Sequence, residues 1–231
     1  MIYVDNKLSQ FIKTDDSYKD ILSRYTRTDG MLAIALYISL LLVYYLMGLL
    51  VVHKQIYLGI PVNLLSIAVC IALVLIRGQK PDSIGFTLKN IGKSILAGAV
   101  SGIVFTFFMN ILPNILAGNK LIPAGQALYN IFYYFIVISL SEEVIFRGYI
   151  QTRIYGLIKR DIPAVITVGF LFYLMHLPFQ ITVNGMQISL INMGIIVALH
   201  CVMNFLYRRY NSLAAPAVFH GILDWGGNLL I

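Results

Sequence analysis

Long hydrophobic runs separated by short polar segments dominate the chain. The first, residues 31–52 ("MLAIALYISLLLVYYLMGLLVV"), has no charged residue and reaches the roughly 20 apolar residues that an α-helix needs to cross a bilayer. Similar runs follow at 57–76 and at about 94–118, 124–150, 162–181, 186–206 and 212–231. The pattern predicts an all-α, polytopic membrane bundle of about seven transmembrane helices.

Residues 1–30 are polar and lack the apolar core and cleavage site of a signal peptide. Apolar side chains nevertheless recur in them near helical spacing. These two features leave two interpretations open, an amphipathic helix on the inner membrane surface or a flexible tail. Residues 31–231 are treated as one transmembrane domain. The apolar positions of the segment are Leu8, Phe11, Ile12, Tyr18, Ile21, Leu22 and Tyr25.

The composition supports a membrane protein, since 59% of the residues are hydrophobic and only 12% are charged, against roughly a quarter charged in soluble domains. Lys and Arg alternate between rich and poor in successive polar segments, which predicts a cytoplasmic N-terminus and an outer C-terminus. The net charge of +7 therefore reflects topology and contact with membrane lipids, not nucleic acid. The short length and the lack of targeting additions favour a bacterial plasma membrane.

Three charges interrupt the apolar run that ends in "SEEVIFRGYI", residues 141–150. Each ionisable group at bilayer depth costs at least about 2.5 kcal/mol, so it normally faces a cavity and serves a function. Glu143 and Arg147 stand four residues apart and can pair, whereas Glu142 is rotated by about 100° and stays free for chemistry. The alternative, a helix that leaves the membrane early, is less favoured because the following residues remain largely apolar.

Histidines in later spans can reach the same depth. Glu142 and His176 lie equally far from a turn near Lys159, so antiparallel helices would place them level with each other. In the last run, His220 and Asp224 are four residues apart, an arrangement in which a carboxylate can orient an imidazole. Such a pair could also serve only to join helices.

Two further polar groups lie in the preceding run. His200 and Asn204 again stand four residues apart, which makes His200 a rival ligand. His53 lies in a short outer loop and is interpreted as an interfacial residue. Cys70 and Cys201 fall in separate runs, so no disulfide is predicted.

The motifs "EEVIFR", "FYLMH" and "HGILD", in this order and in apolar helices, resemble the E-E-x-x-x-R, F-x-x-x-H and H-x-x-x-N/D motifs of the CPBP family, the CAAX prenyl proteases and bacteriocin-processing proteins. The run "SLAAPAVFH" and the upstream "IGFTL" also resemble that family. The three motifs and their lead-in cover about 136–231, within a catalytic core expected at about 124–231.

The resemblance implies an intramembrane endopeptidase that cleaves hydrophobic, prenylated or otherwise lipid-anchored peptides. It implies that Glu142 is the general base and that His176 and His220 hold the water, a metal ion or the oxyanion. Glu143 and Arg147 would pair structurally, and Asp224 would fill the final Asn/Asp position. A divalent ion such as zinc, bound by Glu142, His176 and His220, and a metal-free water activated by glutamate are equally consistent with these residues.

The chain departs from the family where His200 and Asn204 replace small residues, which either widens the polar site or changes the substrate. Two other functions are considered. One is a non-catalytic member that acts in bacteriocin immunity or as a scaffold. The other is a proton-coupled transporter, which the nearly uniform apolarity of the first two runs disfavours. Glu142→Gln distinguishes the first of these from a peptidase.

Overall fold

The computed structural model describes residues 14–231, in which helices are joined by short connections and the β-structure is limited to a single antiparallel bridge between Leu121 and Leu230. Leu8, Phe11 and Ile12 of the amphipathic segment lie outside the described residues. Six of the described helices are long and apolar enough to cross a membrane. The chain is thus an integral membrane protein with a polytopic helical bundle, as predicted. The six spans are Arg27–Lys54, Gly59–Ile76, Ile91–Leu116, Ala124–Gly156, Asp161–Asn184 and Leu190–Tyr210.

The last helix, α12, runs only from Ala214 to Gly227. It is shorter than the other spans, so the predicted count of seven is not confirmed. At 1.5 Å per residue its 14 residues extend about 21 Å, less than the hydrocarbon core. The chain after it returns to the connection between the third and fourth spans, where the backbone of Ile231 pairs with that of Lys120.

Capping residues explain where two spans differ from their predicted limits. Helix α3 (Arg27–Lys54) begins before residue 31 because Thr26 and Asp29 form a capping box across its first turn. Helix α11 (Leu190–Tyr210) begins after residue 186 because the Ser189 side chain caps it. Single polar side chains at helix starts therefore shift boundaries that hydrophobicity alone places only approximately.

Two spans contain π-helical segments. The third span consists of α5 (Ile91–Thr106), the π-helical η2 (Phe107–Ile111) and α6 (Leu112–Leu116). Pro113, which has no N–H to donate, stands just after η2. The fourth span is one continuous helix that alternates between α, π and 3-10 geometry. Its parts are α7 (Ala124–Phe132), η3 (Tyr133–Ser139), α8 (Leu140–Glu143), η4 (Val144–Ile150), α9 (Gln151–Arg153) and η5 (Ile154–Gly156).

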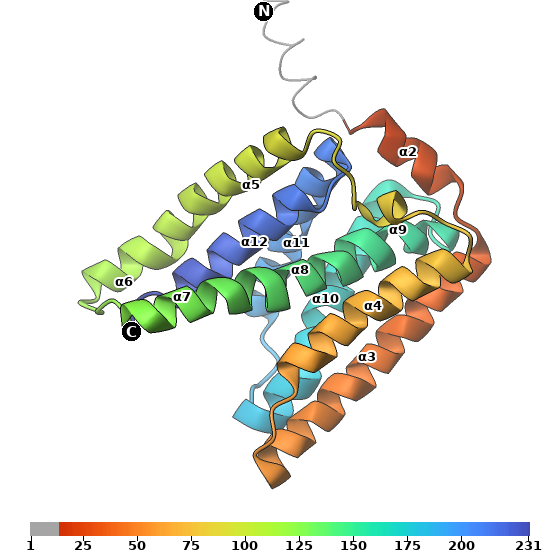
Figure 1. Cartoon of the computed structure of the whole chain (residues 1–231). Helices are drawn as coiled ribbons and strands as arrows, with labels where there is room; N and C mark the ends of the chain where they lie inside the picture. Colours follow the sequence, from red (N-terminus) through yellow and green to blue (C-terminus); the bar gives the residue numbers. More distant parts are fainter. Residues whose placement is uncertain (1–13) are drawn as a thin grey trace, which may run out of the picture.

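The helices form two groups that diverge from one end of the molecule (Figure 1). In one group α12 lies between α5 and the fourth span; in the other α3, α4 (Gly59–Ile76) and α10 (Asp161–Asn184) run together. Helix α12 approaches α5 closely because Gly98 and Gly102 face it. The two groups thereby bring α8, α10 and α12 together in the interior.

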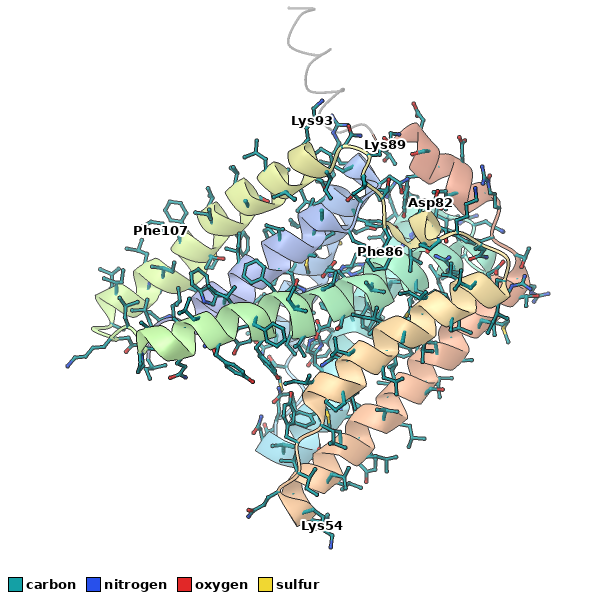
Figure 2. The ribbon with its side chains drawn as sticks, in the orientation of Figure 1. Lys54, Asp82, Phe86, Lys89, Lys93 and Phe107 are labelled. Carbon is teal, nitrogen blue, oxygen red and sulfur yellow. The ribbon has the colours of Figure 1, made fainter. Side chains whose placement is uncertain are left out.

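Helix α2 (Asp16–Ser23) lies at one end of the bundle (Figure 1). Lys89 and Lys93 lie at this end, whereas Lys54 lies at the opposite one (Figure 2). Helix α2 is anchored there by Tyr18, which is fully buried and packs edge-on against Tyr207. We call this end of the molecule the α2 end.

Candidate functional site

The two adjacent glutamates stand in α8, a single α-helical turn between the π-helical η3 and η4. Such π segments occur frequently at functional sites. Glu143 and Arg147 are fully buried, and Arg147 Nη1 lies 3.0 Å from Glu143 Oε1. The Glu142 side chain keeps 15% of its surface exposed. The structure thus gives the two neighbouring carboxylates different surroundings.

His176 comes from α10 and faces Glu142. Its Nε2 atom lies 3.9 Å from Glu142 Oε2, so the two residues that the hairpin argument placed at equal depth lie close together. Its Nδ1 atom is 2.7 Å from the backbone carbonyl oxygen of Phe172. A carbonyl oxygen only accepts, so Nδ1 donates this hydrogen bond, and Nε2 is the ring nitrogen that faces Glu142.

His220 comes from α12 and completes the cluster. Its Nε2 atom is 3.9 Å from Glu142 Oε2 and 3.3 Å from Asp224 Oδ2. Its Nδ1 atom is 2.8 Å from Glu143 Oε1, so Glu143 contacts His220 as well as Arg147. The sequence indicated only the contact with Arg147, because residues 143 and 220 lie on helices whose mutual rotation no local pattern defines.

Glu142 Oε2 is the point on which the two imidazoles converge. It is buried and has no hydrogen-bond partner within the described chain. Both 3.9 Å separations exceed a direct hydrogen bond, and at such distances a bridging water is the first species to consider. A carboxylate oxygen accepts, so a species between it and the imidazoles must donate hydrogen to it. Water meets this requirement.

The ring of Phe172 packs against Arg147, His176 and His220. The guanidinium carbon of Arg147 lies 4.2 Å from its centroid, a distance typical of cation–π contact. The rings of His176 and His220 pack against it edge-on, at 5.0 and 6.2 Å between centroids. This single apolar ring therefore helps to orient the three cationic or potentially cationic side chains.

His200 and Asn204 are not part of this cluster. His200 is fully buried and its Nε2 atom lies 3.2 Å from Gln151 Oε1. Its ring packs against Phe172 at 6.1 Å between centroids. The rival ligand identified in the sequence therefore points to Gln151, while Glu142 is approached by His176 and His220.

The donor types fit zinc, since carboxylate and imidazole are among its usual ligands. The arrangement does not: among residues 14–231, no group of three or more His, Cys, Asp or Glu side chains is placed to hold a metal ion. His220 Nε2, which would have to bind the ion, also lies 3.3 Å from Asp224.

An apolar cavity adjoins the site on the α5 and α11 side. It has a volume of about 640 Å³ and includes Asp224 in its wall. A larger groove of about 910 Å³ lies between the same two helices and shares Phe105, Met109 and Val202 with it. The groove extends to Lys93 and Arg209, toward the α2 end. The walls are mainly apolar, as suits the hydrophobic part of an amphiphile.

The fold and site define a polytopic helical membrane protein in which three helices bring a carboxylate and two imidazoles together. Residues 124–226 match the model of the Rce1-like family, described as type II CAAX prenyl endopeptidase Rce1-like. The match confirms the resemblance to the CAAX proteases and spans every candidate site residue from Glu142 to Asp224. No curated protein and no solved structure matches the chain.

Proposed function

We propose that the protein is an intramembrane endopeptidase of the CAAX type, which hydrolyses peptide bonds with a water activated by Glu142. The observation that carries the proposal is the position of Glu142 Oε2, buried without a hydrogen-bond partner and 3.9 Å from the Nε2 atoms of both His176 and His220. The family match over residues 124–226 supports the reaction class.

In the proposed reaction Glu142 removes a proton from the bound water, and the hydroxide oxygen attacks the carbonyl carbon of the scissile peptide. His176 and His220 hold the water and the oxyanion that develops on the carbonyl oxygen. The C–N bond then breaks, and the proton held by Glu142 passes to the departing nitrogen. The products are a carboxylic acid and an amine, so one water is consumed for each bond cleaved.

Surrounding residues fix the geometry of this reaction. Glu143 accepts from His220 Nδ1 and lies against Arg147. Phe172 holds His176 through its carbonyl oxygen and packs against both imidazoles with its ring. Groups held in this way need little reorganisation when charge develops in the transition state.

The substrates we propose are membrane-associated peptides, prenylated or otherwise hydrophobic. The cavity and the groove between α5 and α11 support this class of substrate, because their mainly apolar walls continue to Asp224 at the candidate site. A lipid chain in the groove would lie within the bilayer while its peptide reaches Glu142.

The proposal is tested with detergent-purified protein and a panel of prenylated and unmodified hydrophobic peptides, with cleavage followed by mass spectrometry. Glu142→Gln keeps the shape of the side chain but removes the base, so kcat should fall by a factor of about 10² to 10⁴. The matched control is Asp20→Asn, which neutralises an exposed carboxylate of α2. Equal cleavage by wild type and Glu142→Gln would refute the proposed mechanism.

Metal content measured on the same samples distinguishes a metal-free mechanism from one that depends on a bound metal ion. The metal-free form predicts that activity survives exhaustive chelation and does not track bound zinc. Loss of activity on chelation, with recovery on adding zinc, would instead assign a metal to the site. Absence of cleavage by both proteins, with full activity of Glu142→Gln in cells, would point to a binding protein.

A further inference from the structure

A second set of buried polar side chains lies behind the site and takes no part in the reaction described above. Gln151 and His200 are fully buried, and Asn204 is 3% exposed. They come from two helices, α9 and α11, and are joined by the contact between His200 Nε2 and Gln151 Oε1 at 3.2 Å. Gly169 leaves room for the histidine ring, since a Cβ atom there would lie 3.3 Å from His200 Cδ2.

Several polar atoms of these buried side chains have no hydrogen-bond partner among residues 14–231. Within the described residues, Gln151 Nε2, His200 Nδ1 and Asn204 Oδ1 have no hydrogen-bond partner, nor have Nε and Nη2 of Arg147, whose Nη1 is paired with Glu143. An unsatisfied buried polar group costs about 1–3 kcal/mol, and proteins normally satisfy such groups with protein or with ordered water. Several such atoms in one region provide the two to four polar contacts that an internal water requires.

The unpaired atoms form a continuous series. Along the fourth span Arg147 precedes Gln151 by four residues, and along α11 His200 precedes Asn204 by four. Residues so spaced are neighbours on a helix surface. Arg147 in turn contacts Glu143, which holds His220. The series therefore reaches from the candidate site toward the α2 end.

At its outer end the series meets an open cavity. This cavity has a volume of about 360 Å³, and Asn204, Cys201 and Arg208 are among its lining residues. Arg208 stands one turn beyond Asn204 on α11 and is paired with Asp161 at the α2 end. Asn204 thus belongs both to the cavity wall and to the buried series.

We propose that Arg147, Gln151, His200 and Asn204 hold a file of water molecules that connects this cavity with the candidate site. The direct opening of the site is on the other side, where Glu142 and His176 keep 15% and 34% of their side-chain surface exposed. A bound hydrophobic peptide would cover that opening and exclude water. The file would then deliver the water that hydrolysis consumes, a role that rests on the proposed function, whereas the file itself does not.

Cysteine reactivity tests the file without any assay of activity. In a Cys70→Ala/Cys201→Ala background, Gln151→Cys is compared with its neighbour Ile150→Cys, which is equally buried but lies in the apolar core. A small methanethiosulfonate reagent reacts with the thiolate, which forms only where water reaches the sulfur. Cysteine at 151 should be labelled at least about tenfold faster than cysteine at 150.

A second pair of cysteine variants keeps the proposal testable if a variant of the first pair fails to fold. Asn204→Cys is compared with Met203→Cys, again two adjacent buried positions of which only the first faces the series. All four variants are checked by thermal unfolding before labelling. Slow labelling at both positions of each pair would show a dry interior, and equally fast labelling at both would show local opening of the helix. Either result overturns the file.

The role in delivering water is tested by a substitution that occupies the space of the water molecules. Asn204→Ala leaves space for water, whereas Asn204→Leu occupies it with an apolar side chain. Asn204→Leu should lower kcat about tenfold relative to Asn204→Ala, with similar KM, because only the supply of water changes. Equal kcat in the two variants would reject the delivery role even where labelling shows water. If no variant or wild type cleaves peptide, the proposed function fails, but the labelling result stands.

Discussion

At the scale of single residues, Glu142 and Glu143 show how neighbouring identical side chains can serve different purposes. Glu143 is fully buried between Arg147 and His220, with which it makes contacts of 3.0 and 2.8 Å. Glu142 Oε2 has no hydrogen-bond partner and faces two imidazole nitrogens. The first arrangement suits a structural ion pair, and the second suits the base of the proposed reaction.

We expect Glu143→Gln and Arg147→Met to destabilise the protein more as single changes than as a pair. Removing one partner of a buried ion pair leaves the other charge uncompensated, which typically costs about 3–5 kcal/mol. Combining the two changes removes both charges, so the double variant should unfold at a higher temperature than either single variant. Thermal unfolding in detergent measures the three. Additive losses would show that the two side chains do not act as a pair.

At the scale of elements, the contact between α5 and α12 controls the position of His220. A Cβ atom on Gly98 would lie 2.3 Å from the backbone oxygen of Ala215, and one on Gly102 would lie 3.2 Å from Phe219 Cα. Small residues four apart let the backbones of membrane helices approach closely. The helix that carries His220 and Asp224 is thereby held against the third span.

Gly98→Ala should therefore lower both stability and cleavage. The added methyl group meets backbone, which cannot rotate away, so α12 must shift, at a cost of about 1–3 kcal/mol. Gly92→Ala is the matched control, because it adds the same methyl group to α5 where nothing lies within 4 Å, and alanine favours the helix. Unfolding temperature and cleavage rate are measured for both. Similar values in both variants would exclude a tight α5–α12 contact.

At the scale of the whole molecule, lysine side chains lie at both ends of the bundle. Lys89 and Lys93 lie at the α2 end and Lys54 at the other (Figure 2). Large apolar side chains such as Leu65, Ile76 and Leu96 are exposed along the helices between them, as expected of a surface that meets lipid. The positive-inside rule predicts that the α2 end faces the cytoplasm.

This orientation is measured by labelling single cysteines in intact cells with a membrane-impermeant maleimide, in the Cys70→Ala/Cys201→Ala background. Lys54→Cys should be labelled from outside, whereas Lys93→Cys should be labelled only after the membrane is permeabilised. Both side chains are exposed, so access to the reagent depends on the membrane alone. The opposite labelling pattern would reverse the orientation.

The fold was largely predictable, but its boundaries were not. Hydrophobic runs located the six spans, since each must hide its backbone polar groups from lipid within one helix. Runs could not show that α12 is shorter, because its end depends on Gly226 and Gly227 and on the return of the chain to residues 120–122. The π-helical segments on either side of Glu142 also left no recognisable sequence signal.

The sequence by itself determined that this is a helical membrane protein, and it predicted which polar residues stand at bilayer depth, where an ionisable group is costly and normally serves a function. It also indicated the contacts within a helix, such as Glu143 with Arg147. Only the tertiary structure decided that Glu143 holds His220 and that His200 turns to Gln151. Those contacts depend on how helices rotate about their axes when they pack, and spacing along one helix does not contain that rotation.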